Sequence, residues 1–169
     1  MKSLQWIALA AAVIAAPSLA QADQAAKASF VGGDGSAKGS ATLTPTPAGV
    51  LIGLDLSGLP PASWVAFHVH ETGTCDPATG HESAGGHFNP GGKKHGFNVA
   101  DGPHAGDMPN QYVGGDGTLH AQVLNSAVTL DDSATGIKGR ALMIHAKPDD
   151  YASQPSGAAG ERLACGVIE

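Results

Sequence analysis

The sequence predicts an all-β domain, in which seven or eight short strands form an antiparallel sandwich or barrel. From residue 50 to residue 57 a valine, an isoleucine and two leucines alternate with Leu51, Gly53, Asp55 and Ser57, which is the two-residue period of a strand. Clusters of glycine and proline separate this run from other short apolar runs. No segment repeats apolar residues at helical spacing over a useful length.

The remaining strands are placed by turn residues and apolar runs. The string Val-Gly-Gly-Asp-Gly occurs at 31–35 and at 113–117, and Asp-Gly between strand-like runs is typical of a hairpin turn. A phosphate-binding glycine loop is the alternative, but neither string opens a helix. Besides residues 50–57, strands are expected at about 27–32, 37–44, 63–70, 117–125, 137–145 and 162–168.

Two long segments interrupt the strand pattern. Residues 71 to about 110 are rich in glycine, histidine and proline, and residues 147–161 form a second irregular segment. Loops of the first length are normally functional or disordered. We therefore expect two long functional loops, which need stabilising interactions beyond strand pairing to stay folded.

The N-terminus predicts export from the cytosol. Lys2 precedes an apolar run from Leu4 to Ala16, and an A-x-A pattern ends at Ala22. This arrangement is typical of a cleaved secretory signal peptide, residues 1–22, followed by one domain, residues 23–169. An uncleaved interfacial anchor is the alternative. No other segment is apolar enough to cross a bilayer.

Charge and cysteine content limit the function further. The formal charge of −6 becomes −7 without residues 1–22, because Lys2 is lost and 8 basic residues face 15 acidic ones. The absence of a basic run argues against nucleic-acid binding, and a net negative charge repels anions at long range. In an exported protein the pair Cys75 and Cys165 favours a disulfide over two free thiols.

Two histidines lie in the expected strand 63–70. Since neighbouring side chains of a strand point to opposite faces, His68 and His70 share one face, and Val65, Phe67 and Val69 share the other, which we assign to the core. Two imidazoles on one face can bind one metal ion. The same pattern also occurs on solvated faces.

The first long loop adds more potential ligands. His87, His95, His104 and Asp107 supply three imidazoles and a carboxylate, a set that suits tetrahedral zinc. Such a site would also supply folding free energy to a glycine-rich loop. An exposed polar loop is the alternative. His145 ends another expected strand, and its spacing alone does not show whether it reaches His68 and His70.

Six segments of the chain resemble the copper–zinc superoxide dismutases, specifically the exported bacterial ones. They are "FHVHETG", "SAGGHFNP", "KKHG", "GPHAGDMPN", "HAKPDD" and "AGERLACGVI". They occur in the order of that family and cover nearly all of the chain from about residue 28 to 168. The resemblance implies an eight-stranded Greek-key sandwich or flattened barrel.

The resemblance also implies a set of site residues. Copper would be bound by His68, His70, His87 and His145, and zinc by His87, His95, His104 and Asp107, with His87 bridging the two metals. Asp149 would accept hydrogen bonds from one copper ligand and one zinc ligand. Arg162 would be the active-site arginine, and Cys75 and Cys165 would form the disulfide within the subunit.

The implied activity is dismutation of superoxide to dioxygen and hydrogen peroxide. Copper would cycle between two oxidation states, whereas zinc would be structural and electrostatic. His87 would carry a proton and Arg162 would dock the superoxide anion, and the enzyme would protect the cell envelope from the periplasm. A copper- or zinc-sequestering protein is the competing hypothesis, but it needs no arginine beside copper. A zinc hydrolase needs an open zinc position, which the four zinc ligands would fill.

Some positions differ from the pattern of the family. The loop 147–161 has few charged residues, so any substrate steering must come from a local positive patch, for which Arg162 and the lysines at 93, 94 and 147 are candidates. For Lys93 and Lys94, solvated surface lysines without a steering role are the alternative. A longer C-terminal tail that helps to build the eukaryotic dimer is missing, so we expect a monomer or a homodimer with a different interface. His81, expected to be solvated, and His120, expected on the outside of a strand, match no ligand position.

Overall fold

The computed structural model describes residues 25–169, so the expected signal peptide, residues 1–22, lies outside the described residues. The regular secondary structure of these residues consists of nine β-strands and two short 3-10 helices. Within it, no helix is long and apolar enough to cross a bilayer.

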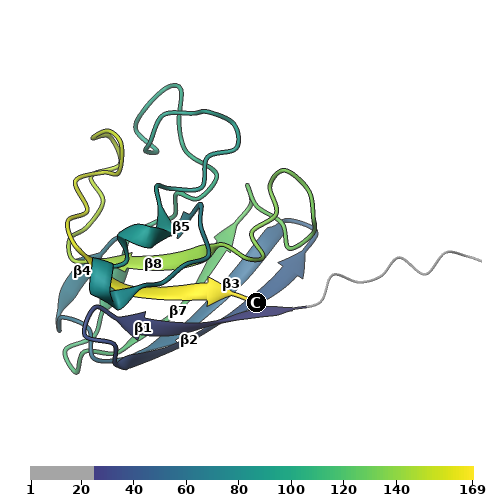
Figure 1. Ribbon diagram of the computed structural model, residues 1–169. Coiled ribbons are helices and arrows are strands. Elements are labelled where there is room, and N and C mark those ends of the chain that lie inside the picture. The colour runs from purple at the N-terminus through teal and green to yellow at the C-terminus, as the bar shows by residue number, and fades with distance from the viewer. Residues whose placement is uncertain (1–24) are drawn as a thin grey trace, which may run out of the picture.

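Seven strands form one curled antiparallel sheet, and two more form a small separate sheet (Figure 1). The order in the large sheet is β5-β8-β9-β1-β2-β3-β7, and β4 pairs with β6. Sequential strands are therefore not always neighbours, because β3 pairs with β7 and β8 lies between β5 and β9. The strands are β1 (Ala26–Gly32), β2 (Ala37–Thr46), β3 (Gly49–Leu56), β4 (Ser63–Val65), β5 (Phe67–His70), β6 (Gln111–Val113), β7 (Leu119–Asn125), β8 (Ala141–His145) and β9 (Arg162–Ile168).

The alternating strand β3 shows why the sheet curls around a core. Val50, Ile52, Leu54 and Leu56 are all buried, whereas Asp55 is exposed. They pack in one continuous apolar cluster with side chains from the other strands of the large sheet. The expected all-β fold is confirmed, and one face of each strand supplies its interior.

The repeated glycine strings are turns, as expected. Gly35 and Gly117 each have φ of +78°, a conformation that glycine adopts at little cost. Gly35 N donates to Gly32 O, and Gly117 N donates to Gly114 O. These turns join β1 to β2 and β6 to β7.

The expected strand 63–70 is two strands, because the chain changes sheets at Ala66. The backbone of Ala66 bonds outside both strands: its N–H donates to Lys147 O, and its carbonyl accepts from His145 N. β4 pairs with β6, a short strand that the sequence did not indicate, whereas β5 pairs with β8. The change aligns β5 with the strand that ends in His145.

The long loops lie together beyond one end of the large sheet, teal and yellow-green in Figure 1. The first carries the 3-10 helices η1 (Pro77–Thr79) and η2 (Glu82–Ala84). The expected disulfide between Cys75 and Cys165 is present, with a Cα–Cα distance of 5.5 Å, and it ties this loop to β9. The expected strand 137–145 begins only at Ala141.

Candidate metal centre

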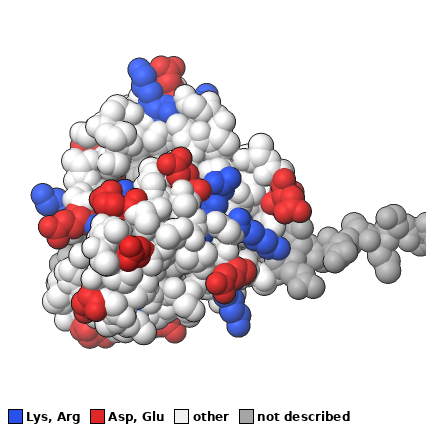
Figure 2. Space-filling model, viewed as in Figure 1, with Lys and Arg blue, Asp and Glu red and all other residues white. Residues whose placement is uncertain are grey.

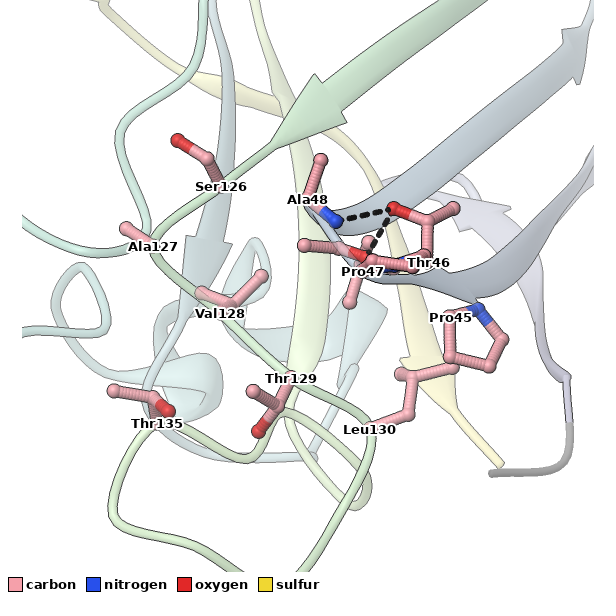
Figure 3. Close-up of a pocket in the computed structure, with 12 residues that line it drawn as sticks. Pro45, Thr46, Pro47, Ala48, Ser126, Ala127, Val128, Thr129, Leu130 and Thr135 are labelled. Atoms are coloured by element: carbon pink, nitrogen blue, oxygen red, sulfur yellow. Dashed lines mark hydrogen bonds between the residues drawn. The ribbon is translucent and has the colours of Figure 1, made fainter. Parts of the chain in front are cut away.

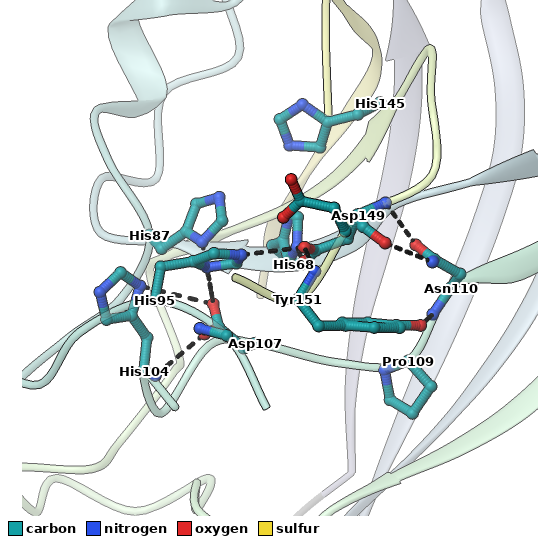
Figure 4. Close-up of polar contacts among 12 residues, drawn as sticks. His68, His87, His95, His104, Asp107, Pro109, Asn110, His145, Asp149 and Tyr151 are labelled. Carbon is teal, nitrogen blue, oxygen red and sulfur yellow. Dashed lines mark hydrogen bonds and ion pairs between the residues drawn. The ribbon is translucent and has the colours of Figure 1, made fainter. Parts of the chain in front are cut away.

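Six histidines and two aspartates converge where β5 and β8 meet the two long loops. Figure 4 labels all of them except His70. All eight side chains are buried. In each of three groups, the potential ligand atoms lie within 4.8 Å of one another. The groups are His68, His70, His87 and His145; His87, His95, His104 and Asp107; and His68, His95 and Asp149.

Strand geometry builds the all-histidine group. His68 and His70 alternate with Phe67 and Val69 on β5, and the latter two pack in the core as the two-residue period predicts. β5 pairs with β8, which ends at His145 after an irregularity in the β8–β9 register. A backbone bridge between His70 and His87 brings in the fourth member from the long loop.

Hydrogen bonds at the outer ring nitrogens aim these imidazoles inward. His68 Nε2 donates to Asp149 Oδ2 at 2.8 Å, and His70 Nδ1 donates to Gly85 O at 2.9 Å. His145 Nδ1 lies 3.5 Å from Gly160 O. Since a neutral imidazole has one N–H, the opposite nitrogen of each ring carries a lone pair. Two of these, His70 Nε2 and His145 Nε2, lie 3.3 Å apart.

The second group centres on one oxygen of Asp107. Asp107 Oδ1 lies 2.9 Å from His87 Nδ1, 3.1 Å from His95 Nδ1 and 3.4 Å from His104 Nδ1. Its Oδ2 accepts from the backbone N–H groups of Gly96 and His104. One carboxylate oxygen is thus held by the loop while the other faces three imidazole nitrogens, which is a tetrahedral type of donor set.

His87 belongs to both groups. Its Nδ1 faces Asp107, and its Nε2 is buried with no protein hydrogen-bond partner. The Nδ1 atoms of His68 and His104 are also buried without such a partner. Buried nitrogens without partners are costly, and their convergence on common points fits two bound cations.

Asp149 connects the two groups. Its Oδ1 accepts from His95 Nε2 at 2.9 Å and its Oδ2 accepts from His68 Nε2 at 2.8 Å. The side chain of Asn110 bonds both backbone groups of Asp149, and Tyr151 N donates to Asp149 Oδ1 (Figure 4). The contacts that the resemblance implied for Asp149 are therefore present in the fold.

Burial and the two carboxylates set the protonation of these groups in the metal-free chain. Burial lowers the pKa of His68 to about 4 and that of His145 to about 3. Burial alone would also lower the pKa of His95, but its hydrogen bonds with Asp107 and Asp149 raise it to about 9. Burial opposes ionisation of both aspartates, yet hydrogen bonds from histidines hold their pKa values well below the usual range.

A cavity of about 550 Å³ opens onto the all-histidine group. Its lining includes His70, His87, His145 and Arg162. Arg162 Nη1 donates to His81 O at 2.8 Å and its Nη2 donates to Gly85 O at 2.9 Å. The guanidinium is therefore held rigidly at the wall beside the imidazoles.

A second cavity, of about 420 Å³, lies between the β2–β3 turn and residues 126–135 (Figure 3). Its lining consists of small, apolar and hydroxyl side chains, and Thr46 Oγ1 there bonds within its own turn, donating to Gly49 O. No ionisable side chain lines it among the described residues. The chemistry of the described chain is concentrated at the histidine site.

Positive charge is scattered rather than gathered around the cavity. The face in Figure 2 carries basic and acidic side chains interspersed. Lys94 forms an exposed pair with Asp101, and no lysine lines the histidine cavity in residues 25–169. The side chain of Lys147 packs beside Gly160, which lines the cavity.

The two histidines outside the potential ligand groups, His81 and His120, differ in their exposure to solvent. His120 lies exposed on β7 beside Asp55, as expected. His81, expected to be solvated, is fully buried at the start of η2, so this prediction was wrong. Its ring nitrogens form no protein hydrogen bond of ordinary geometry, although the Gly32 backbone lies near enough to favour the protonated ring slightly. The surrounding polar loop sequence gives no signal of this burial.

Comparisons with known proteins agree in the kind of protein they identify. A family model described as copper/zinc superoxide dismutase matches residues 37–168. A Cu-Zn superoxide dismutase of Aquifex aeolicus is 48% identical over 172 residues, covering 99% of both chains. One of Caulobacter vibrioides is 39% identical over 143 residues, covering 81% of each. The crystal structure of a SOD-like protein from Bacillus subtilis matches with a TM-score of 0.79 and 38% identity, covering 83% of this chain and 95% of that one.

Proposed function

The chain belongs to the copper/zinc superoxide dismutase family, whose members dismutate superoxide with copper and zinc, and we propose that each metal takes one of the two four-residue groups. The all-imidazole group, His68, His70, His87 and His145, suits copper, because imidazole tolerates both oxidation states of that metal. The group with a carboxylate, His87, His95, His104 and Asp107, suits zinc.

The observation that carries this assignment is the shared imidazole of His87. It is the one residue common to both four-residue groups; its Nδ1 lies 2.9 Å from Asp107 Oδ1, whereas its Nε2 is buried without a protein hydrogen-bond partner. In this proposal His87 would serve as a ligand of both metals. When bound, copper supplies one-electron redox chemistry and zinc supplies a fixed positive charge.

The protein contributes docking, proton transfer and orientation. Arg162 binds the superoxide anion at the cavity wall through guanidinium N–H groups that its two carbonyl contacts leave free. In the state in which it does not hold copper, His87 Nε2, buried at the same cavity, would take up one proton and donate it to the peroxide product, whose second proton would come from water. Asp149 keeps His68 and His95 in the tautomers whose Nδ1 atoms face the metals.

Export is part of the same proposal. Residues 1–22 would act as a signal peptide and be removed, and the enzyme would protect the cell envelope from superoxide in the periplasm. The disulfide between Cys75 and Cys165 supports an oxidising compartment. The proposed metal ligands and Arg162 all belong to one chain, so a monomer or a homodimer can carry the reaction.

The shared role of His87 can be tested by metal-binding measurements on His87→Ala. Competition against chelators should show that affinity for copper and for zinc both fall, by at least about tenfold, because one imidazole leaves both sites. His120→Ala, which removes an exposed imidazole, is the control and should leave both affinities unchanged. A variant that loses affinity for only one metal would contradict the bridge.

A further inference from the structure

Arg162 carries a third contact, which is not needed to hold it in place. Besides its bonds to the carbonyls of His81 and Gly85, its Nη2 lies 3.3 Å from Glu82 Oε2. Carbonyls accept hydrogen bonds but leave the positive charge of the guanidinium intact, whereas the carboxylate neutralises it. Glu82 is therefore a counter-ion rather than only an anchor.

The exposure of the two partners shows that this contact can open. The side chain of Glu82 is 74% exposed and that of Arg162 is 15% exposed. An ion pair with one solvated partner contributes little net free energy, so the carboxylate can leave while the guanidinium stays fixed by the two carbonyls. An anion that reaches Arg162 has to displace a weakly held group.

Both partners line the cavity that opens onto the imidazoles. The other charged residue of that lining is Glu71, whose Oε1 accepts from Gly86 N and is thereby held by the loop. The lining thus holds two carboxylates and one guanidinium, with no lysine among its described residues. For a protein whose substrate is an anion, the carboxylate on Arg162 is the one placed to compete with it.

We propose that Glu82 is a displaceable counter-ion of Arg162 that weakens anion docking and so sets the capture rate and anion selectivity of the site. This inference rests on the docking role proposed above for Arg162. Glu82 would favour small anions that can approach beside the carboxylate, and its removal would strengthen docking of any anion at the guanidinium.

The contact itself can be tested without superoxide, because the chain contains only two arginines. Phenylglyoxal adds to guanidine N–H groups, and the carboxylate of Glu82 holds Arg162 Nη2 by an ion pair that opposes this reaction. In metal-loaded Glu82→Gln, Arg162 should react about fivefold faster than in the natural chain, the effect of one charge at about 4 Å in water. Arg140, stacked over Phe88 at 3.9 Å, is the internal reference and should react at its natural rate.

Pulse radiolysis then tests the consequence for the substrate. Glu82→Gln should raise the second-order rate constant for superoxide about two- to fivefold at low ionic strength, with the gain shrinking above about 0.1 M salt. Asp55→Asn removes the same charge from the outer face of β3 and should change the rate much less.

Each negative result has a distinct meaning. Equal modification of Arg162 in both proteins overturns the counter-ion contact. If Arg162 is modified faster in Glu82→Gln, but the superoxide rate constant of this variant is no higher than that of Asp55→Asn, the proposed effect of Glu82 on anion docking is overturned. If every metal-loaded protein, including the natural one, fails to remove superoxide, the proposed function fails with it, and the modification rates still report on the contact separately.

Discussion

Replacing Asp149 by asparagine should break one of the two hydrogen bonds by which this side chain connects the two groups of metal ligands, because a single carboxylate oxygen becomes an NH2 group. The carboxylate of Asp149 accepts from His68 Nε2 and from His95 Nε2 at 2.8 and 2.9 Å. An amide has one acceptor oxygen and one donor NH2. One of the two imidazoles would then meet a donor, and it could bond only by moving its own proton to Nδ1, the atom that faces a metal.

The size of the effect follows from these contacts. Hydrogen bonds to a charged group contribute about 1.5–3 kcal/mol each, and Asp149→Asn loses one and weakens the other, so the metal-free protein should lose about 2–4 kcal/mol of unfolding free energy. Loss of such a supporting partner typically lowers metal affinity by about 10–100-fold. Urea unfolding of the metal-free protein and chelator competition for copper and zinc measure the two quantities.

The neighbouring residue provides the control. Asp150 is exposed and accepts from Ala152 N and Ser153 N within its own loop, without contact to a histidine. Asp150→Asn should leave both metal affinities near those of the natural chain. If Asp149→Asn binds both metals within about threefold of the natural chain, the reasoning from tautomers is refuted.

Three further changes test other parts of the structure. Burial lowers the pKa of His81, so as the pH falls below 6.5 the unfolded chain takes up a proton there more readily than the folded chain, and the unfolding free energy falls. In His81→Gln, urea unfolding should show a shallower loss of unfolding free energy as the pH falls from 6.5 to about 5, and parallel curves for the two proteins would contradict this. Replacing Cys75 and Cys165 by serine opens a 90-residue connection and should lower unfolding free energy by about 4–5 kcal/mol in the chain-entropy model; a change under about 1 kcal/mol argues against it. Lys147→Glu should lower the superoxide rate constant most at low ionic strength, unlike Lys27→Glu on β1, and an unchanged salt dependence removes Lys147 as a steering group.

The strand pattern was predictable where one face of a strand is buried and the other is solvated. β3 shows this alternation, and the turns at Gly35 and Gly117 were predicted by residues that favour their backbone conformation. The division of residues 63–70 was not predictable. Val65 and Phe67 both reach the core, so the side-chain period continues across Ala66 while the hydrogen bonds change partner.

The residues of the metal site could be named from the sequence, but the long-range contacts that bring them together could not be derived from residue spacing. Spacing placed His68 and His70 on one face of a strand, because that follows from local geometry. The approach of His145 depends on the pairing of β5 with β8, which is a long-range contact. The burial of His81 and the contact of Glu82 with Arg162 depend on how the loop packs against β9, for which the loop sequence has no period to follow.

The most direct measurement combines metal content with superoxide removal on the same sample. The natural protein should contain about one copper and one zinc per chain, since each four-residue group fits one cation. Selective removal of copper should abolish superoxide removal while zinc stays bound, and copper added back should restore it. A protein that holds both metals and does not remove superoxide would contradict the account and leave a metal-binding protein in its place.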